Sequence, residues 1–585
     1  MTAIRPAQPA GEPPRTAQPR TAQPPSAPAA TTPQPPGAGP AGRSGGNTSL
    51  ALLIGALALL PWLFTAVAQP SFAVQLSLGV GSVLLVVTAA LLVVAEVHGD
   101  FGIVRWRIGS WYLLWSALIF GPLSLQWLQD DPSEGLSWIS RIDRSSVIGA
   151  LGVVCAAYGC WALGYRCGFP RAVVGAVTAA KVAVLGGSRS VLRGPAMPWL
   201  VYGVGLLGFL LNYLQTGRYG YVGADPTSMV SNPMATTQLL YVVSQMTLIG
   251  LGGAAYRAFD PRIRGGRATL WTLFAVEISM GMLRGSKEAF FMATLALLIP
   301  YGAVRGRLPW RLLAASLVLL FVVAVPFNAA YREAVRQRGA TGELRSASLT
   351  AAFAAAPEIL SSALNSTDGR GRSDDVFLFR MRRIDSVAIV WQLTPSRVSY
   401  LDPVRFLRAP FVGMIPRAIW PDKPVETPGW TFAQVYLGQP ASVFSAYAVT
   451  PIGDLYRSGG WLVLLPGMLL MGMGYRLFDG LFRTGSDPRA FCFIIVFFPL
   501  AIKSESDYYS MLTSLPAGLV AGALGAWLMC RPLRDRRTPA RAPDPAGSAP
   551  LIRDSAGGAR HAARGSVVDG EAVTARRTPV GTEMS

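Results

Sequence analysis

Apolar runs of near-spanning length recur along the chain between residues 49 and 530. A helix needs about 20 apolar residues to cross the hydrocarbon core of a bilayer. We therefore expect about 12 spans, and the runs at 269–284, 288–304 and 489–503 are the least secure because they are short. The expected spans are 49–68, 72–96, 109–128, 146–164, 198–214, 237–257, 269–284, 288–304, 310–328, 460–478, 489–503 and 509–530. The pattern predicts an all-α polytopic membrane protein.

Both ends of the chain lack this pattern. Residues 1–48 are rich in Pro and Ala, and residues 531–585 are basic and rich in Pro, Ala and Gly. Such segments cannot bury a hydrophobic core, so we expect two disordered tails.

Positive charge predicts the orientation, because short cytoplasmic loops collect Lys and Arg. The best fit puts both termini in the cytoplasm of a multi-pass cell-membrane protein, although the outer loop 129–145 also holds Arg141 and Arg144. Spans 1–9 then occupy residues 49–328 and spans 10–12 occupy residues 460–530. The apolar stretch 171–186 is interpreted as interfacial. The expected inner loops carry Arg105, Arg107, Arg166, Arg171, Lys181, Arg189, Arg193, Arg262, Arg264, Arg267, Arg305 and Arg307.

This topology makes residues 329–459 one large extracytoplasmic loop. A structureless loop of that size is unusual, so we expect a folded element. Residues 349–364 are rich in Ala and Leu, which predicts a helix, and residues 369–375 form a polar break. The loop has apolar anchors at Trp391, Phe406, Phe411, Trp420, Trp430, Phe432 and Tyr436.

Composition agrees with a membrane protein and excludes several functions. Hydrophobic residues make up 51% of the chain and charged residues 14%, while the net charge of +20 is spread over loops and tails. We therefore expect the lipid bilayer, and no nucleic acid, as a partner. The two histidines, His98 and His561, cannot serve an outer site, and no phosphate-binding GxxxxGK[ST] loop is present. We expect no metal and no cofactor.

Three polar segments are candidate binding sites. In the first, Arg380, Arg382 and Arg383 crowd beside Asp385. Guanidinium groups hold phosphate oxygens through paired hydrogen bonds, so the cluster suits an anion. Internal salt bridges with carboxylates such as Asp385 are the alternative.

The second segment joins two apolar runs through Arg284, Lys287 and Glu288. Ionisable groups at membrane depth are functional candidates, and the alternative is a turn whose charges reach the headgroups. The third segment, 415–424, places Arg417, Trp420 and Lys423 among prolines. Its aromatic face suits a sugar ring and its cations suit phosphate, whereas a rigid loop packed on the membrane is the alternative.

From Arg382 to Gly474 the chain resembles the O-antigen and capsule polysaccharide polymerases, a family of Wzy-type oligosaccharide repeat-unit polymerases. The matching features are the Arg-Arg pair at Arg382, the Pro-Arg-x-x-Trp-Pro-x-Lys-Pro string from Pro416, and Pro-Ile-Gly-Asp-Leu-Tyr-Arg-Ser-Gly-Gly over 451–460. Many spans with one large outer loop also agree.

This resemblance implies a glycosyltransferase that polymerises polyprenyl-diphosphate-linked oligosaccharides on the outer side of the membrane. The product would be a cell-surface polysaccharide, and a chain-length regulator and a flippase of the same pathway would be partners. The resemblance also implies that Arg382, Arg417 and Arg457 engage the diphosphate or the glycan. Related ligases commonly depend on an outer-loop histidine, which this chain lacks, so either a carboxylate assists or no side-chain base is needed.

Glycosyl transfer from a diphosphate requires two contributions from the protein. Preorganised arginines stabilise the departing diphosphate, and a carboxylate within hydrogen-bond reach assists the incoming hydroxyl. The catalytic candidates are Asp385, Asp454 and Glu288, each of which can instead be an ion-pair partner of a nearby arginine.

Two other functions compete with polymerisation. A lipid-phosphosugar-dependent glycosyltransferase adding single sugars often has acidic residues in an early outer loop, where Asp130 and Asp131 lie. A flippase or exporter of lipid-linked glycans would show internal repeats. The sequence shows no half-to-half similarity, which disfavours export.

Overall fold

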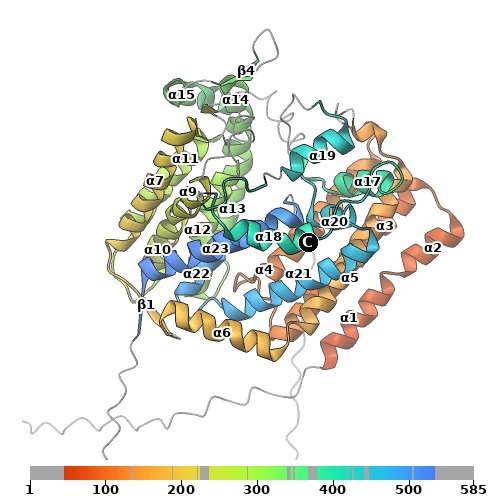
Figure 1. The fold of residues 1–585 in the computed structure, drawn as a ribbon, viewed down its shortest axis with the longest axis horizontal. Coiled ribbons are helices and arrows are strands. Elements are labelled where there is room, and N and C mark those ends of the chain that lie inside the picture. Colours follow the sequence, from red (N-terminus) through yellow and green to blue (C-terminus); the bar gives the residue numbers. More distant parts are fainter. Residues whose placement is uncertain are drawn as a thin grey trace, which may run out of the picture. The chain divides into compact units, whose positions relative to one another are not determined.

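The computed structural model describes residues 45–533 apart from a set of short gaps. The gaps are 134–135, 137, 188, 220–221, 224–235, 286, 339–343, 347–348, 366–378, 418, 425–426, 441–446, 486 and 503–505. The described part is predominantly helical (Figure 1). Both predicted tails, apart from their innermost residues, and the predicted break at 369–375 lie outside the described residues.

The first half of the chain contributes helices that alternate with short turns. They are α1 (Gly45–Leu57), α2 (Leu60–Ala68), α3 (Phe72–His98), α4 (Ile108–Phe120), α5 (Arg144–Cys167), α6 (Arg171–Leu185), α7 (Met197–Thr216), α9 (Thr237–Ser244), α10 (Met246–Phe259), α11 (Arg267–Leu283) and α12 (Lys287–Arg305). Two 3₁₀ helices, η1 (Pro122–Leu128) and η2 (Ile139–Arg141), follow α4.

The second half contains both long helices and the short helices of the large loop. They are α13 (Trp310–Leu319), the π-helical η3 (Leu320–Ala324), α14 (Val325–Val335), α15 (Leu349–Asn365), α17 (Ile384–Leu393), α18 (Arg405–Met414), α19 (Pro428–Leu437), α20 (Pro451–Tyr456), α21 (Trp461–Leu481), α22 (Arg489–Ile502) and α23 (Tyr508–Met529).

Among the described residues, strands form only three two-stranded antiparallel sheets. β1 (Ser190–Leu192) pairs with β6 (Cys530–Pro532), β2 (Arg218–Tyr219) with β3 (Val222–Gly223), and β4 (Arg336–Arg338) with β5 (Leu344–Ser346).

Ten helical segments in the described part are long and apolar enough to cross a membrane. These segments make the chain compatible with a multi-pass membrane protein. Ten of the twelve expected runs correspond to them. The segments are Ser49–Ala68, Phe72–His98, Ile108–Leu128, Arg144–Cys167, Met197–Thr216, Gln238–Phe259, Glu288–Arg305, Trp310–Tyr331, Trp461–Leu481 and Tyr508–Met529.

The other two expected runs are helices outside the ten candidate spans. The run at 269–284 is α11, with 17 residues, and the run at 489–503 is α22, with 14 residues. Nearly every residue of α22 is buried, because α4, α10, α12 and α23 all pack against it. Its hydrophobicity therefore comes from a central place in the bundle. The stretch interpreted as interfacial is α6, which falls outside the ten candidate spans.

Helix packing depends on glycines at the points of closest approach. α5 packs between α3 and α21 (Figure 1). A Cβ at Gly164 would collide with the backbone of Leu469, and one at Gly472 with the backbone of Trp161. Small residues let membrane helices approach backbone to backbone, which strengthens dispersion contacts where no hydrophobic effect acts.

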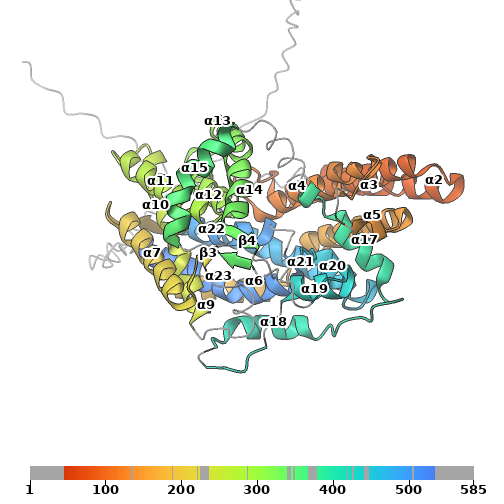
Figure 2. The same cartoon turned by 90° about the horizontal axis from the view of Figure 1, so that it is seen from above.

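The expected large loop contains five described helices, so it is folded as predicted. The predicted helix at 349–364 is α15. α17 packs against α5 and α20, and α18 lies along α23 (Figure 2). These contacts bring α17 and α18 onto one end of the helix bundle.

Two opposite ends of the bundle follow from α5 and α21, which run in the same direction. Near their first residues both meet Trp391 of α17, since its ring lies against Gly149 and 6.0 Å from the ring of Trp461. Near their last residues Tyr165 donates a hydrogen bond to Asp479. We call the first end the loop end and the second the far end.

Candidate functional site

A buried carboxylate between two arginines is the central polar feature of the loop end. Asp454 Oδ1 accepts hydrogen bonds from Arg457 Nε at 2.9 Å and from Arg405 Nη2. Asp454 Oδ2 accepts from the backbone N–H of Tyr509 at 3.0 Å. Three segments far apart in the sequence, α18, α20 and the start of α23, therefore meet at one side chain.

Local sequence explains part of this arrangement. Thr450 begins α20, and its hydroxyl accepts a hydrogen bond from the backbone N–H of Gly453 at 3.1 Å, which is an N-cap. Asp454 and Arg457 then lie three residues apart and one helical turn brings them together. Arg457 Nη2 lies 2.8 Å from Asp454 Oδ1, so both nitrogen types of this guanidinium engage the carboxylate.

These side chains are largely buried, so their charges must be paired within the protein. The Asp454 and Arg457 side chains are 0% and 2% exposed, while that of Arg405 is 14% exposed. A buried charge is tolerated only when it is paired and hydrogen-bonded. Arg405 is therefore the member of the Asp454 cluster (Arg405, Asp454, Arg457) that retains access to the surface.

A second carboxylate adjoins the cluster. Asp507 caps α23 by accepting hydrogen bonds from the backbone N–H of Ser510 at 2.7 Å and from its hydroxyl at 2.8 Å. Burial raises the pKa of Asp507 to about 6, and the negative charge of Asp454 adds to the rise. With Asp507 ionised the two arginines are balanced by two carboxylates, and with Asp507 protonated the group gains one positive charge.

A separate ion pair holds the start of α17. Arg382 Nε donates to Asp385 Oδ2 at 2.9 Å, and Trp127 Nε1 donates to Asp385 Oδ1 at 2.8 Å. Arg382 Nη2 donates to the carbonyl of Pro132 at 2.8 Å. Burial raises the pKa of Asp385, and the charge and hydrogen bond of Arg382 oppose this rise.

The Arg382 guanidinium also lies over two aromatic rings. Its carbon is 4.4 Å from the ring centre of Phe379 and 5.2 Å from that of Trp127. Cation–π contacts of this kind are strongest where water is excluded, and the Arg382 side chain is 0% exposed. Among the described residues its Nη1 has no hydrogen-bond partner.

The other two arginines of this cluster differ from Arg382. Arg380 is exposed, and Arg383 is half-buried with its backbone N–H donated to the carbonyl of Ile119 at 3.4 Å. Internal pairing, the alternative considered from the sequence, thus accounts for Arg382 and Asp385.

The 415–424 segment is a loop closed by its own cations. Arg417 donates to the carbonyls of Pro421 and Pro424, each at 3.2 Å. Lys423 donates to the carbonyl of Ile415 at 3.0 Å and to Gln238 at 3.3 Å, and burial lowers its pKa. Trp420 is 37% exposed. The hydrogen bonds of Arg417 and Lys423 thus agree with the alternative in which this segment is a rigid loop.

Arg284 takes part in a third polar group, at the end of α11. Its Nη2 lies 3.2 Å from Glu277 Oε1, whose other oxygen accepts from Tyr202 at 3.0 Å. The Arg284 guanidinium covers the ring of Phe209 at 4.2 Å. Glu288, in the first turn of α12, is exposed, whereas the carboxylate of Glu277 in α11 is buried.

The structure therefore divides the predicted residues among separate polar groups. It pairs Asp385 with Arg382 and Asp454 with Arg457. In the part of the chain that is described, Arg382, Arg417 and Arg457 share no hydrogen-bond or ion-pair partner. Sequence reasoning missed Trp127, Arg405 and Tyr509, which reach the two carboxylates from distant segments. It also missed Asp507, whose pKa is raised in part by the charge of Asp454.

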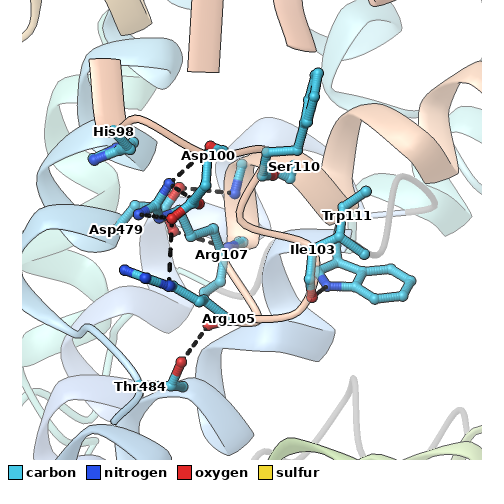
Figure 3. A network of polar contacts seen from close by, with 12 residues as sticks. His98, Asp100, Ile103, Arg105, Arg107, Ser110, Trp111, Asp479 and Thr484 are labelled. Atoms are coloured by element: carbon cyan, nitrogen blue, oxygen red, sulfur yellow. Dashed lines mark hydrogen bonds and ion pairs between the residues drawn. The ribbon is translucent and has the colours of Figure 1, made fainter. Parts of the chain in front are cut away.

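A further polar network occupies the far end (Figure 3). Asp479 accepts hydrogen bonds from the backbone N–H groups of Ile108 at 2.8 Å and Gly109 at 3.1 Å, and from the hydroxyl of Tyr165 at 2.8 Å. His98 Nε2 lies 2.9 Å from the same hydroxyl. The carboxylate thus caps α4, and the network fastens α21 to α4 and α5.

The loop beside this network is closed by arginines. Arg107 Nη1 lies 2.7 Å from Asp100 Oδ1, and Arg105 Nε lies 3.3 Å from Asp100 Oδ2 (Figure 3). Thr484 donates to the carbonyl of Arg105 at 2.7 Å. All of these contacts have structural roles in joining helix ends.

Comparison with known proteins finds one match. Residues 223–478 match a family described as a domain of unknown function (DUF8712). No curated protein matches the chain, and no solved structure matches it. The matched region contains Arg405, Asp454 and Arg457, and it ends one residue before Asp479.

Proposed function

We propose that this chain polymerises polyprenyl-diphosphate-linked oligosaccharide repeat units into a cell-surface polysaccharide, acting as a glycosyltransferase on the outer side of the cell membrane. The observation that supports the proposal best is the Asp454 cluster. Two of its members, Asp454 and Arg457, lie in the 451–460 segment, which is one of the three segments that carry the resemblance to repeat-unit polymerases. The cluster also gathers two guanidinium groups at the loop end.

The chemistry of this cluster suits a departing diphosphate. The bond from the sugar to the diphosphate breaks while the leaving oxygen gains negative charge. Donors that are already oriented stabilise that charge without reorganising. Arg405, with 14% of its side chain exposed, is the donor we assign to the diphosphate. Asp454 and Arg457 are positioning residues in this proposal, because Asp454 fixes both guanidinium groups.

The incoming hydroxyl requires a proton acceptor or a direct transfer to the leaving group. Asp385 and Asp454 both hold an arginine through an ion pair, so neither has a free oxygen facing a substrate in this conformation. We therefore propose that the reaction proceeds without either carboxylate as the base. The diphosphate oxygen itself can take the proton as the bond to the sugar breaks.

The side of the membrane on which the loop lies is part of the same proposal. The distribution of Arg and Lys favours cytoplasmic termini and an extracytoplasmic 329–459 loop. The loop end would then face the lipid-linked substrate, and a flippase and a chain-length regulator of the pathway would be its partners.

Deleting the gene in the producing organism tests the proposal. Polymer should disappear and lipid-linked single repeat units should accumulate, because each unit is still made and exported. A lipid-linked unit that lacks one sugar would instead support the single-sugar transferase. Unchanged polymer would refute both enzymes.

Complementation adds a matched pair of variants. R405A should restore little polymer, whereas R397A should restore it fully, because Arg397 is an exposed arginine of the same loop. Equal amounts of each variant in the membrane are required for the comparison. Equal polymer from both variants would remove Arg405 from the mechanism.

A further inference from the structure

Helix α18 has two apolar faces, and only one of them is covered by protein. Phe406, Ala409, Val412 and Gly413 are buried against the bundle. On the opposite side Leu407 is 73% exposed, Phe411 65% and Met414 61%. Residues spaced by three and four positions share one helix face, so these three side chains form a continuous outward stripe.

The stripe continues into the following loop. Ile419 is 76% exposed, and Trp420 follows it. Large contiguous apolar patches of this kind on a protein surface mark contact with a partner or a membrane. A covering partner is therefore needed, and the neighbours of α18 indicate which one.

The neighbours of α18 are the first turns of two candidate spans. Gly413 packs against the backbone of Thr513 in α23, five residues after the span begins at Tyr508. Gln238, the first residue of the span Gln238–Phe259, donates a hydrogen bond to the carbonyl of Gly413. Both spans begin at the loop end, so α18 lies beside the first turns of two candidate spans (Figure 2).

The depth of α18 agrees with an interfacial position. Five residues of helix correspond to about 8 Å along the axis of a span. Amphipathic helices in the plane of a membrane bury their apolar face roughly 5–10 Å into the boundary between headgroups and acyl chains. α18 therefore lies within the depth range at which such helices are found.

Charge and aromatic residues also fit the headgroup region. α18 contains no acidic residue, and Arg408 is exposed beside Leu407 and Phe411. Long basic side chains at this depth extend to anionic headgroups while their stems stay among apolar groups. Trp420 suits the same region, because tryptophan is enriched at membrane interfaces.

We infer that α18 is a membrane-inserted helix held against the first turns of α23, and that its face of Leu407, Phe411 and Met414 inserts among the acyl chains of the bilayer leaflet at the loop end. The inference is independent of the proposed reaction. It has one consequence for that reaction: Arg405, the first residue of α18, is held at headgroup level. A lipid-linked phosphate can then reach the Asp454 cluster without leaving the bilayer.

Photo-crosslinking in a bilayer tests this directly. Benzoylphenylalanine is placed singly at Leu407, Phe411 and Met414, and each protein is reconstituted into vesicles of phosphatidylethanolamine and radiolabelled phosphatidylglycerol. Leu462, 88% exposed within the span Trp461–Leu481, serves as the positive control. The exposed loop residue Arg397 serves as the negative control.

We expect label on the protein at all three α18 positions, at a level near that of position 462 and several-fold above that of position 397. Label at 407, 411 and 414 no higher than at 397, with strong label at 462, overturns the inference. A crosslinked band of twice the chain mass at these positions also overturns it, since a second copy would then cover the face. Because all three side chains point outward, the substitutions remove no internal packing, and gel filtration before irradiation checks the fold.

Discussion

Arg405 and Asp454 form an ion pair although 49 residues separate them in the sequence. The same carboxylate holds Arg457, its neighbour one helical turn away. One buried aspartate thus joins a membrane-proximal helix, α18, to the short helix α20 that precedes α21. The pair therefore depends on the packing of α18 against α23, which brings Arg405 to Asp454.

Replacing Asp454 with Asn should destabilise the protein strongly. The amide cannot neutralise Arg405 and Arg457, so the buried guanidinium group of Arg457 and the partly buried one of Arg405 lose their counter-charge. Breaking a buried ion pair from one side costs about 3–5 kcal/mol. Thermal unfolding of D454N in nanodiscs, followed by circular dichroism, should show a clear loss against wild type. D422N, at an exposed aspartate, should unfold like wild type. Equal unfolding temperatures for D454N and D422N would mean that solvent reaches the cluster.

Asp507 should make stability depend on pH. Its pKa is raised to about 6 in the folded protein, above its usual value, so the folded state holds this proton more tightly than the unfolded state. The associated stability is fully present below about pH 4 and is lost as the pH rises through about 6. The difference corresponds to roughly 3 kcal/mol at most.

D507N removes this titration while retaining an oxygen that can cap α23. The unfolding temperature of wild type minus that of D507N should therefore increase when the pH is lowered from about 7.5 to about 5. D422N should differ from wild type by the same amount at both pH values. A constant difference between wild type and D507N would show that Asp507 is already ionised throughout this range.

The sequence predicted those features that depend on neighbouring residues. Span positions follow from local hydrophobicity, and ten of the twelve expected runs have the required length and composition. The pairs Arg382–Asp385 and Asp454–Arg457 are three residues apart, so helical spacing alone brings them together. Hydrophobicity alone does not distinguish α22 from a span, because a short helix surrounded by others is as apolar as one that faces lipid.

Contacts between distant segments could not be predicted in this way. Arg405 belongs to a series of loop arginines that look alike in the sequence, and only packing of α18 on α23 directs it to Asp454. Trp127 reaches Asp385 across 258 residues. The apolar positions of α18 were noted only as anchors at Phe406 and Phe411, which the structure puts on opposite faces of the helix.

Replacing Arg380 or Arg382 with lysine should change the stability of the protein by different amounts. Arg382 is buried between Phe379 and Trp127 and pairs with Asp385, whereas Arg380 is exposed. Lysine keeps the charge but loses the planar contacts, so R382K should cost about 1–3 kcal/mol of stability. R380K should be close to neutral. Denaturant unfolding of both variants in the same nanodiscs measures the difference, and similar losses would place both side chains in equivalent surroundings.

The far-end network should contribute to stability without taking part in the reaction. Tyr165 donates a hydrogen bond to the buried carboxylate of Asp479, and hydrogen bonds to charged groups contribute about 1.5–3 kcal/mol. Y165F removes only the hydroxyl, leaving the ring packed on Trp161. We expect a loss of that size in unfolding free energy, together with normal polymer per folded molecule in complemented cells.

Tyr301 provides the matched control for this change. It is half-buried, and its ring packs edge-to-face on Phe259. In the described part of the chain no hydrogen bond from its hydroxyl is found, so Y301F should stay within about 0.5 kcal/mol of wild type. A contact that only joins helices affects activity through the stability of the fold. If Y165F lowered the amount of polymer per folded molecule but left stability normal, the Asp479 network would therefore act on the reaction itself.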